Sequence, residues 1–128
     1  MYNYLLMTTE KAAIVTHEID AKGKRLGRVA SEIAILLMGK DRADAVRNAT
    51  APVQVDVKNA SKLHIDENKI LQKVYLHYSG YPGGQKKETM RKVITDKGHA
   101  EVLRRAVYGM LPSNRLRSLR MKQLAISE

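Results

Sequence analysis

Hydrophobic residues recur along the chain in two spacings, one typical of strands and the other of helices. A cluster of β-branched residues predicts a strand over residues 12–19. Over residues 53–58 valine alternates with polar and charged side chains, which is the pattern of a strand buried on one face. A third strand is predicted over residues 71–78, directly before a glycine-rich turn. These three segments are the strands that the pattern predicts.

Apolar residues at helical spacing predict three helices. The first covers residues 26–37, and Gly39 is its expected C-cap. The second covers residues 100–111 and is stopped by the proline that follows. A short third helix is expected to start near Leu116, with Ser113 or Asn114 as its N-cap. Four arginines and lysines crowd this last helix, which makes it the most basic element.

The order strand, helix, strand predicts a βαβ unit with a parallel pair of strands and a right-handed crossover. A polar connection is expected over residues 40–52, and turns over residues 59–62 and 66–68. A chain of 128 residues without internal repeats or a linker has the length of one domain. We therefore expect a single α/β domain over residues 12–128, preceded by a flexible extension over residues 1–11.

The charge balance narrows the class of partner. The chain has 23 Lys and Arg against 13 Asp and Glu, a net charge of +10 and a pI of 9.9. This excess indicates a polyanion, with nucleic acid as the first choice and an acidic membrane surface as the second. Phe and Trp are absent, and this disfavours extended platforms for base stacking. Binding of folded RNA by shape and charge is therefore the preferred interpretation.

Composition also limits the compartment. The absence of cysteine excludes disulfides and thiolate zinc sites, and it fits a reducing compartment. The N-terminal residues lack the basic start and the apolar length of a signal peptide. No apolar run approaches the roughly 20 residues of a membrane span. We expect a soluble, intracellular protein.

The start of the first predicted helix is unusually basic. Lys22, Lys24, Arg25 and Arg28 gather there, although the helix dipole disfavours cations at an N-terminus. This arrangement makes sense if an anion binds at the same place.

A glycine-rich turn follows the third predicted strand. Residues 79–84 read Ser-Gly-Tyr-Pro-Gly-Gly, and Lys86 and Lys87 follow directly. Glycine lets a backbone approach a bulky partner closely, and the lysines can neutralise phosphate. A tight turn beside solvated lysines is the alternative, and the residues alone leave both open.

Motifs for catalysis and metal binding are missing. Neither glycine segment has the spacing of a P-loop or a dinucleotide-binding loop. The four histidines show no metal-ligand spacing, and Ser79 does not lie in a nucleophile elbow. We therefore expect no catalytic residue, no metal site and no cofactor.

Four blocks of the sequence, in order, resemble the ribosomal protein L-thirteen family of the large subunit. They are residues 19–40 with Ile-Asp-Ala-Lys-Gly-Lys-Arg-Leu-Gly-Arg-Val-Ala-Ser, residues 58–62 with Lys-Asn-Ala-Ser-Lys, residues 73–84 with Ser-Gly-Tyr-Pro-Gly-Gly, and residues 106–114 with Ala-Val-Tyr-Gly-Met-Leu-Pro and Asn114. The family's loop histidine falls at Tyr78 here, with His77 one place early, and the family's Leu-Gly-Arg reads Leu116-Arg117-Ser118. The sequence also stops at Glu128, before the His-Pro-His tail of many members, so no contact made by that tail is carried over.

The resemblance implies a three-layer α/β/α sandwich with a small, mostly parallel four-stranded sheet. It further implies a structural constituent of the large ribosomal subunit that binds 23S-type rRNA, supports early assembly and has no enzymatic activity. The implied partners are this rRNA and neighbouring large-subunit proteins, with no membrane, no small-molecule substrate and no homo-oligomer. The implied location is the cytoplasm.

By the same resemblance, the expected RNA contacts fall in three of the four blocks. They are Lys22, Lys24, Arg25, Arg28, Lys40, Ser79, Gly80, Tyr81, Gly83, Gly84, Lys86, Lys87, Asn114, Arg115 and Arg117. Two rival functions are a free RNA-binding translational regulator and, with less support, an enzyme acting on a small phosphorylated ligand.

Overall fold

The computed structural model describes residues 13–128, and the extension predicted over residues 1–11 lies outside them. The described residues form an α/β fold, which confirms the expected fold class. In chain order the elements are β1 (Val15–Asp20), α1 (Leu26–Met38), β2 (Val53–Lys58), a 3-10 turn η1 (Ala60–Lys62), α2 (Glu67–Gln72), β3 (Val74–Tyr78), β4 (Gln85–Thr89), α3 (Met90–Lys97), α4 (His99–Met110), α5 (Leu116–Lys122) and β5 (Leu124–Ile126).

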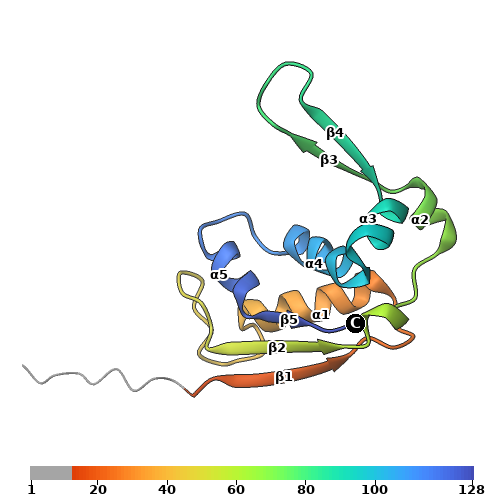
Figure 1. Cartoon of the computed structure of the whole chain (residues 1–128). Coiled ribbons are helices and arrows are strands. Elements are labelled where there is room, and N and C mark those ends of the chain that lie inside the picture. The colour runs from red at the N-terminus through yellow and green to blue at the C-terminus, as the bar shows by residue number, and fades with distance from the viewer. Residues whose placement is uncertain (1–12) are drawn as a thin grey trace, which may run out of the picture.

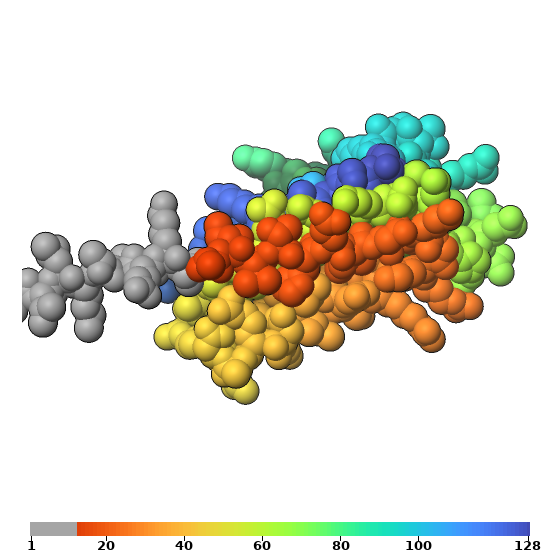
Figure 2. Space-filling view, turned by 90° about the horizontal axis from the view of Figure 1, so that it is seen from below, coloured from red at the N-terminus to blue at the C-terminus, as the bar shows by residue number. Residues whose placement is uncertain are grey.

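The main sheet has three parallel strands in the order β1-β2-β5. β2 is the central strand, and its three valines at 53, 55 and 57 are buried while the residues between them are more exposed. The predicted βαβ unit is confirmed in its parallel pairing, because β1 and β2 pair in register from Val15 with Val53 to Asp20 with Lys58. β1 is an outer strand, and Figure 2 shows it along the molecular surface (red).

The core lies between this sheet and the helices α1, α3 and α4 (Figure 1). α1 buries one stripe of side chains, including Val29, Ile33 and Leu37, and packs against α4, whose Leu103 is fully buried. Burial of such a side chain contributes about 1.5–3 kcal/mol. The predicted C-cap is confirmed, because Gly39 has φ 74° and its N–H donates to the last turn of α1.

The prediction of a four-stranded sheet is wrong. The segment predicted as a third strand begins only at Val74, since Leu71 and Gln72 end helix α2. β3 then pairs antiparallel with β4, and the two form a separate sheet. The predicted turn over residues 66–68 is also wrong, because Asp66 precedes α2 directly and Glu67 begins it.

Besides α2, three further elements were not predicted, and each has a physical reason. β4 is polar on both faces and packs little into the core, so its sequence lacks the apolar alternation by which a strand is predicted. α3 buries only Met90 and Val93, and Thr89 caps it by accepting a hydrogen bond from the N–H of Lys92. β5 has three residues, and its place is fixed by pairing with β2 rather than by its own sequence.

The hairpin of β3 and β4 extends away from the body of the molecule (Figure 1). Its side chains are mostly exposed, with Leu76 at 62% and Tyr81 at 74%. The second face of the main sheet is also polar and largely exposed, as Glu18 and Gln54 show. Residues 13–128 therefore do not confirm the three-layer sandwich, and the layering stays a prediction.

Candidate nucleic-acid interface

The turn between β1 and α1 is held in a fixed shape by backbone hydrogen bonds. The Asp20 carboxylate accepts hydrogen bonds from the N–H of Lys22 at 3.0 Å and from the Asn59 side chain at 2.9 Å. These bonds, the Lys22 one first, lower the pKa of the Asp20 carboxyl. Gly23 has φ 70°, and its N–H donates to the carbonyl of Lys62. The turn is thus attached to the segment after β2.

The N-terminus of α1 carries positive charge that is only partly compensated. Arg25 is its N-cap residue but forms no side-chain cap, and the first turn contains no acidic residue. Lys22, Lys24, Arg25 and Arg28 are all exposed around it, as predicted. The only carboxylate near them in an ion pair among the described residues is Glu32, 3.9 Å from the Lys24 Nζ. We call these four cations the α1 cluster.

A hollow of about 620 Å³ lies beside the α1 cluster. Its lining includes the cations Lys24, Arg25 and Arg28 and one carboxylate, that of Glu32, together with Gly23 and Val29. The dipole of the helix end favours an anion at this position, although the N–H groups of Leu26, Arg28 and Val29 already donate to backbone carbonyls. The hollow therefore has the charge and the side-chain donors to hold a phosphate group.

Lys40 lies apart from the α1 cluster. It follows the C-terminus of α1, and 13 helical residues separate the two ends by about 20 Å. The Lys40 side chain is exposed, and its N–H donates to the carbonyl of Ile35. Lys40 and the α1 cluster therefore do not form one site.

The turn at the tip of the hairpin depends on its glycines. Gly80 and Gly83 have φ of 88° and 72°, which disfavours any residue with a Cβ. The N–H of Gly84 donates to the carbonyl of Tyr81 at 3.0 Å, and the N–H of Ser79 donates to that of Gly84 at 3.3 Å. The predicted contact residues from Ser79 to Gly84 therefore lie together on one exposed, well-defined tip.

Lys86 and Lys87 lie on strand β4 rather than in the turn. Lys86 pairs with His77 and Lys87 with Leu76, so the two lysines point to opposite faces of the hairpin. Lys86 faces the body of the molecule, where it lines a groove against α4. A single phosphate cannot contact both lysines side by side.

The predicted contacts in the last block are partly engaged within the protein. The Asn114 side-chain oxygen accepts a hydrogen bond from the N–H of Leu116 at 3.1 Å. The N-cap residue of α5 is Arg115, which forms no side-chain cap, so the prediction of Ser113 or Asn114 as the N-cap is wrong. The Arg117 guanidinium lies 3.9 Å from the ring centroid of Tyr108. Arg115 is exposed. Of the two arginines, Arg115 is the less constrained.

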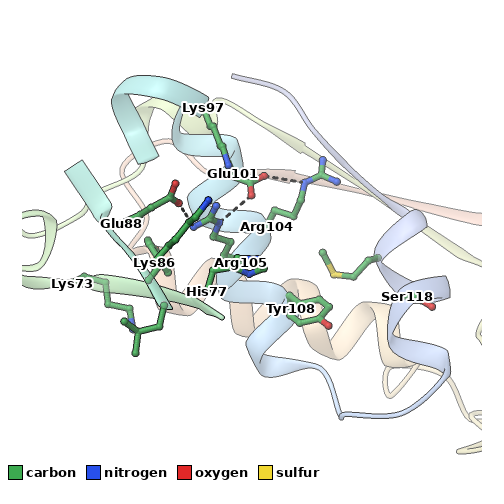
Figure 3. Close-up of a pocket in the computed structure, with 13 residues that line it drawn as sticks. Lys73, His77, Lys86, Glu88, Lys97, Glu101, Arg104, Arg105, Tyr108 and Ser118 are labelled. Carbon is green, nitrogen blue, oxygen red and sulfur yellow. Dashed lines mark hydrogen bonds and ion pairs between the residues drawn. The ribbon is translucent and has the colours of Figure 1, made fainter. Parts of the chain in front are cut away.

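A groove of about 930 Å³ separates the hairpin from α4 and α5 (Figure 3). Arg105 crosses its floor, with Glu101 at 3.0 Å, Glu88 at 3.5 Å and the Tyr75 ring at 4.9 Å. Burial raises the pKa of the Tyr75 hydroxyl. We call this hollow the hairpin groove; Lys86 is the only predicted contact residue that lines it.

Residues 13–128 show neither a metal-binding group nor a membrane-spanning helix. Within this range no group of three His, Asp or Glu side chains is placed to hold a metal ion. No helix in this part of the chain has the length and apolar character to cross a bilayer.

Comparison with known proteins decides the family. Residues 15–128 match the family model described as "Ribosomal protein L13". The chain belongs to this family. It is 46% identical over 109 residues to the large ribosomal subunit protein uL13 of Thermus thermophilus, covering 84% of this chain and 76% of the relative.

Two further relatives of the L13 family show the same extent of similarity. The large ribosomal subunit protein uL13 of Rubrobacter xylanophilus is 42% identical over 108 residues, which cover 84% of this chain and 75% of that protein. The large ribosomal subunit protein uL13m of Schizosaccharomyces pombe is 42% identical over 114 residues, covering 89% of this chain and 73% of that protein. The resemblance drawn from the sequence blocks is confirmed.

Two basic residues of this L13 family member were not singled out in the sequence. Lys62 is exposed, and its carbonyl accepts the N–H of Gly23, so its backbone adjoins the α1 cluster. Its position in the Asn-Ala-x-Lys turn was a usable signal. Arg120 is only 3% exposed, and its Nε has no hydrogen-bond partner in the described residues. No pattern in the sequence distinguishes it from the other arginines of α5.

Proposed function

We propose that this chain is a structural constituent of the large ribosomal subunit that binds large-subunit rRNA and supports early assembly. Its membership of the L13 family and the names of its relatives support this role, which is not enzymatic. The observation that carries RNA binding is the α1 cluster. Four exposed cations surround a helix N-terminus that has no acidic residue and no side-chain cap.

In this proposal the α1 cluster binds phosphates, and the hairpin tip fits against the RNA backbone. Gly80 and Gly83 leave open space where a side chain would stand, so the backbone of the tip can approach RNA closely. Lys40 and Arg115 add phosphate contacts at separate places on the surface. Contacts of this kind position a protein on folded RNA and carry little sequence information.

The outer face of the hairpin supports a contact with neighbouring large-subunit proteins. Val74, Leu76 and Tyr78 form an exposed stripe there, with Lys87 opposite Leu76. Aliphatic side chains offer RNA no hydrogen bonds, whereas they are common at protein interfaces. Within the assembled subunit, a three-layer arrangement would require another layer to cover the exposed face of the main sheet.

Co-sedimentation with large ribosomal subunits at high salt tests the proposed function. A resident protein stays bound to the large subunit, because many contacts attach the protein to the particle. A free RNA-binding regulator is released as salt rises, because its binding depends mainly on a few phosphate contacts. Release of the whole protein at moderate salt, with the subunits intact, would contradict the proposal.

A further inference from the structure

We propose that the hairpin groove holds one unpaired nucleotide of the bound RNA, with its base on Tyr108 and its phosphate at Lys86 and Lys97. The inference rests on the proposed function and adds a site to it. The groove is lined by β3, β4, α3, α4 and α5, so it joins elements that are far apart in the sequence (Figure 3). Its volume of about 930 Å³ lies in the range of small-molecule pockets.

The charges of the groove favour an anion. Its lining contains five Lys or Arg side chains and two carboxylates, those of Glu88 and Glu101. Both carboxylates are engaged with Arg105, and Glu101 also lies 3.9 Å from Arg104. Lys86 and Lys97 are exposed and form no ion pair with any described residue. These two lysines, one on β4 and one at the end of α3, remain available for a phosphate.

The aromatic wall favours a base. Tyr108 is 47% exposed and lines the groove. Arg117 lies 3.9 Å from its ring centroid, yet Arg117 is not among the groove residues. The guanidinium therefore covers the ring from outside the groove and holds it in place, and ring surface is left for a second stacking partner.

An unpaired nucleotide satisfies both features at once. A paired base is stacked inside a helix and hides its faces, whereas an unpaired base can stack on an aromatic ring. One such base needs one tyrosine, so the low aromatic content of the chain does not oppose it. An acidic protein segment would match the lysines but would leave the exposed ring without a matched partner.

The test combines affinity measurements with cross-linking on the full chain. Binding of a large-subunit rRNA transcript is measured for wild type, Tyr108→Ala, Tyr108→Phe and Lys97→Gln. We expect Tyr108→Ala to weaken binding by about 5- to 100-fold, the range of one lost stacking contact, and Tyr108→Phe to keep it. Lys97→Gln should weaken binding, while Lys92→Gln on the same helix α3, outside the groove, serves as the matched control.

Ultraviolet cross-linking of the wild-type complex locates the contact. We expect RNA bases cross-linked to peptides that contain Tyr108 or Met121. Unchanged affinity of Tyr108→Ala, with cross-links only at the α1 cluster or the hairpin tip, would overturn the groove site and leave the proposed function standing. If Tyr108→Ala instead lost the contact with a neighbouring protein and kept its affinity for RNA, the groove would be assigned to a protein segment. That result would also overturn the inference. A wild-type chain that fails to bind rRNA at all would contradict the proposed function itself.

Discussion

At the scale of single residues, a few hydrogen bonds fix the turn that presents the α1 cluster. Asp20 ends β1 and joins the turn to Asn59, whose own φ is 60°. The carboxylate also accepts the N–H of Lys22, so one side chain holds two segments together. Since the charged form accepts these bonds best, its pKa is lowered from the ordinary value of 3.8.

The lowered pKa of Asp20 predicts a pH-dependent stability. A carboxyl group whose pKa is lower in the folded than in the unfolded protein stabilises the fold at any pH above its unfolded-state pKa. This stabilisation is lost as the pH falls through the folded-state pKa. We expect wild type to melt at a higher temperature than Asp20→Asn at pH 6, with the difference shrinking below about pH 4. Thermal unfolding of both proteins between pH 3 and pH 7 checks this. A difference independent of pH would show that the charge of Asp20 has no role.

The geometry of the hairpin tip predicts a defect in RNA binding rather than in stability. A Cβ at Gly84 would collide with the Ser79 hydroxyl and lie 2.9 Å from the Tyr81 carbonyl oxygen. We expect Gly84→Ala to distort the tip and weaken RNA binding, while the melting temperature changes little because the hairpin lies outside the core. Gly109→Ala is the stability comparison, because nothing lies within 4 Å and its position in α4 favours alanine by about 0.5–1 kcal/mol. A Gly84→Ala protein with normal RNA affinity would contradict the role of the tip.

At the scale of elements, α4 carries stability and the hairpin carries exposed surface. Leu103 is fully buried against the core, whereas Leu76 is 62% exposed on β3. We expect Leu103→Ala to lower the free energy of unfolding by about 2–5 kcal/mol, and Leu76→Ala to change it by about 0.5 kcal/mol or less. Urea denaturation of both variants measures the difference. Equal losses would mean that the hairpin packs on the body of the protein.

The elements predicted correctly are those whose own sequence has a strong period. α1 and β2 bury complete stripes of one face, so their pattern is visible in the chain. β4 and β5 obtain their structure from a pairing partner, which no local pattern reveals. The segment around Leu71 was predicted as a strand because helix α2 has only 6 residues and buries no side chain completely, so it shows no helical period.

At the scale of the whole molecule, the sequence names the candidate cations, whereas their grouping in space comes only from the structure. Lys22 to Arg28 are adjacent in the chain and stay together, whereas Lys40 is separated by the length of α1. The hairpin groove unites residues from Lys73 to Met121, and only tertiary packing brings these together. The opposite orientations of Lys86 and Lys87 follow from β4, the strand that the sequence did not reveal.

The dependence of RNA affinity on salt concentration tests the central claim most directly. The logarithm of the binding constant falls with the logarithm of salt by about 0.7–0.9 for each phosphate contact. We expect the variant with Lys24, Arg25 and Arg28 changed to Ala to bind large-subunit rRNA more weakly and with a slope shallower by about 2. Lys92→Ala, on α3 and outside the cluster, should keep the wild-type slope. A triple variant with an unchanged slope would show that the start of α1 does not bind phosphate.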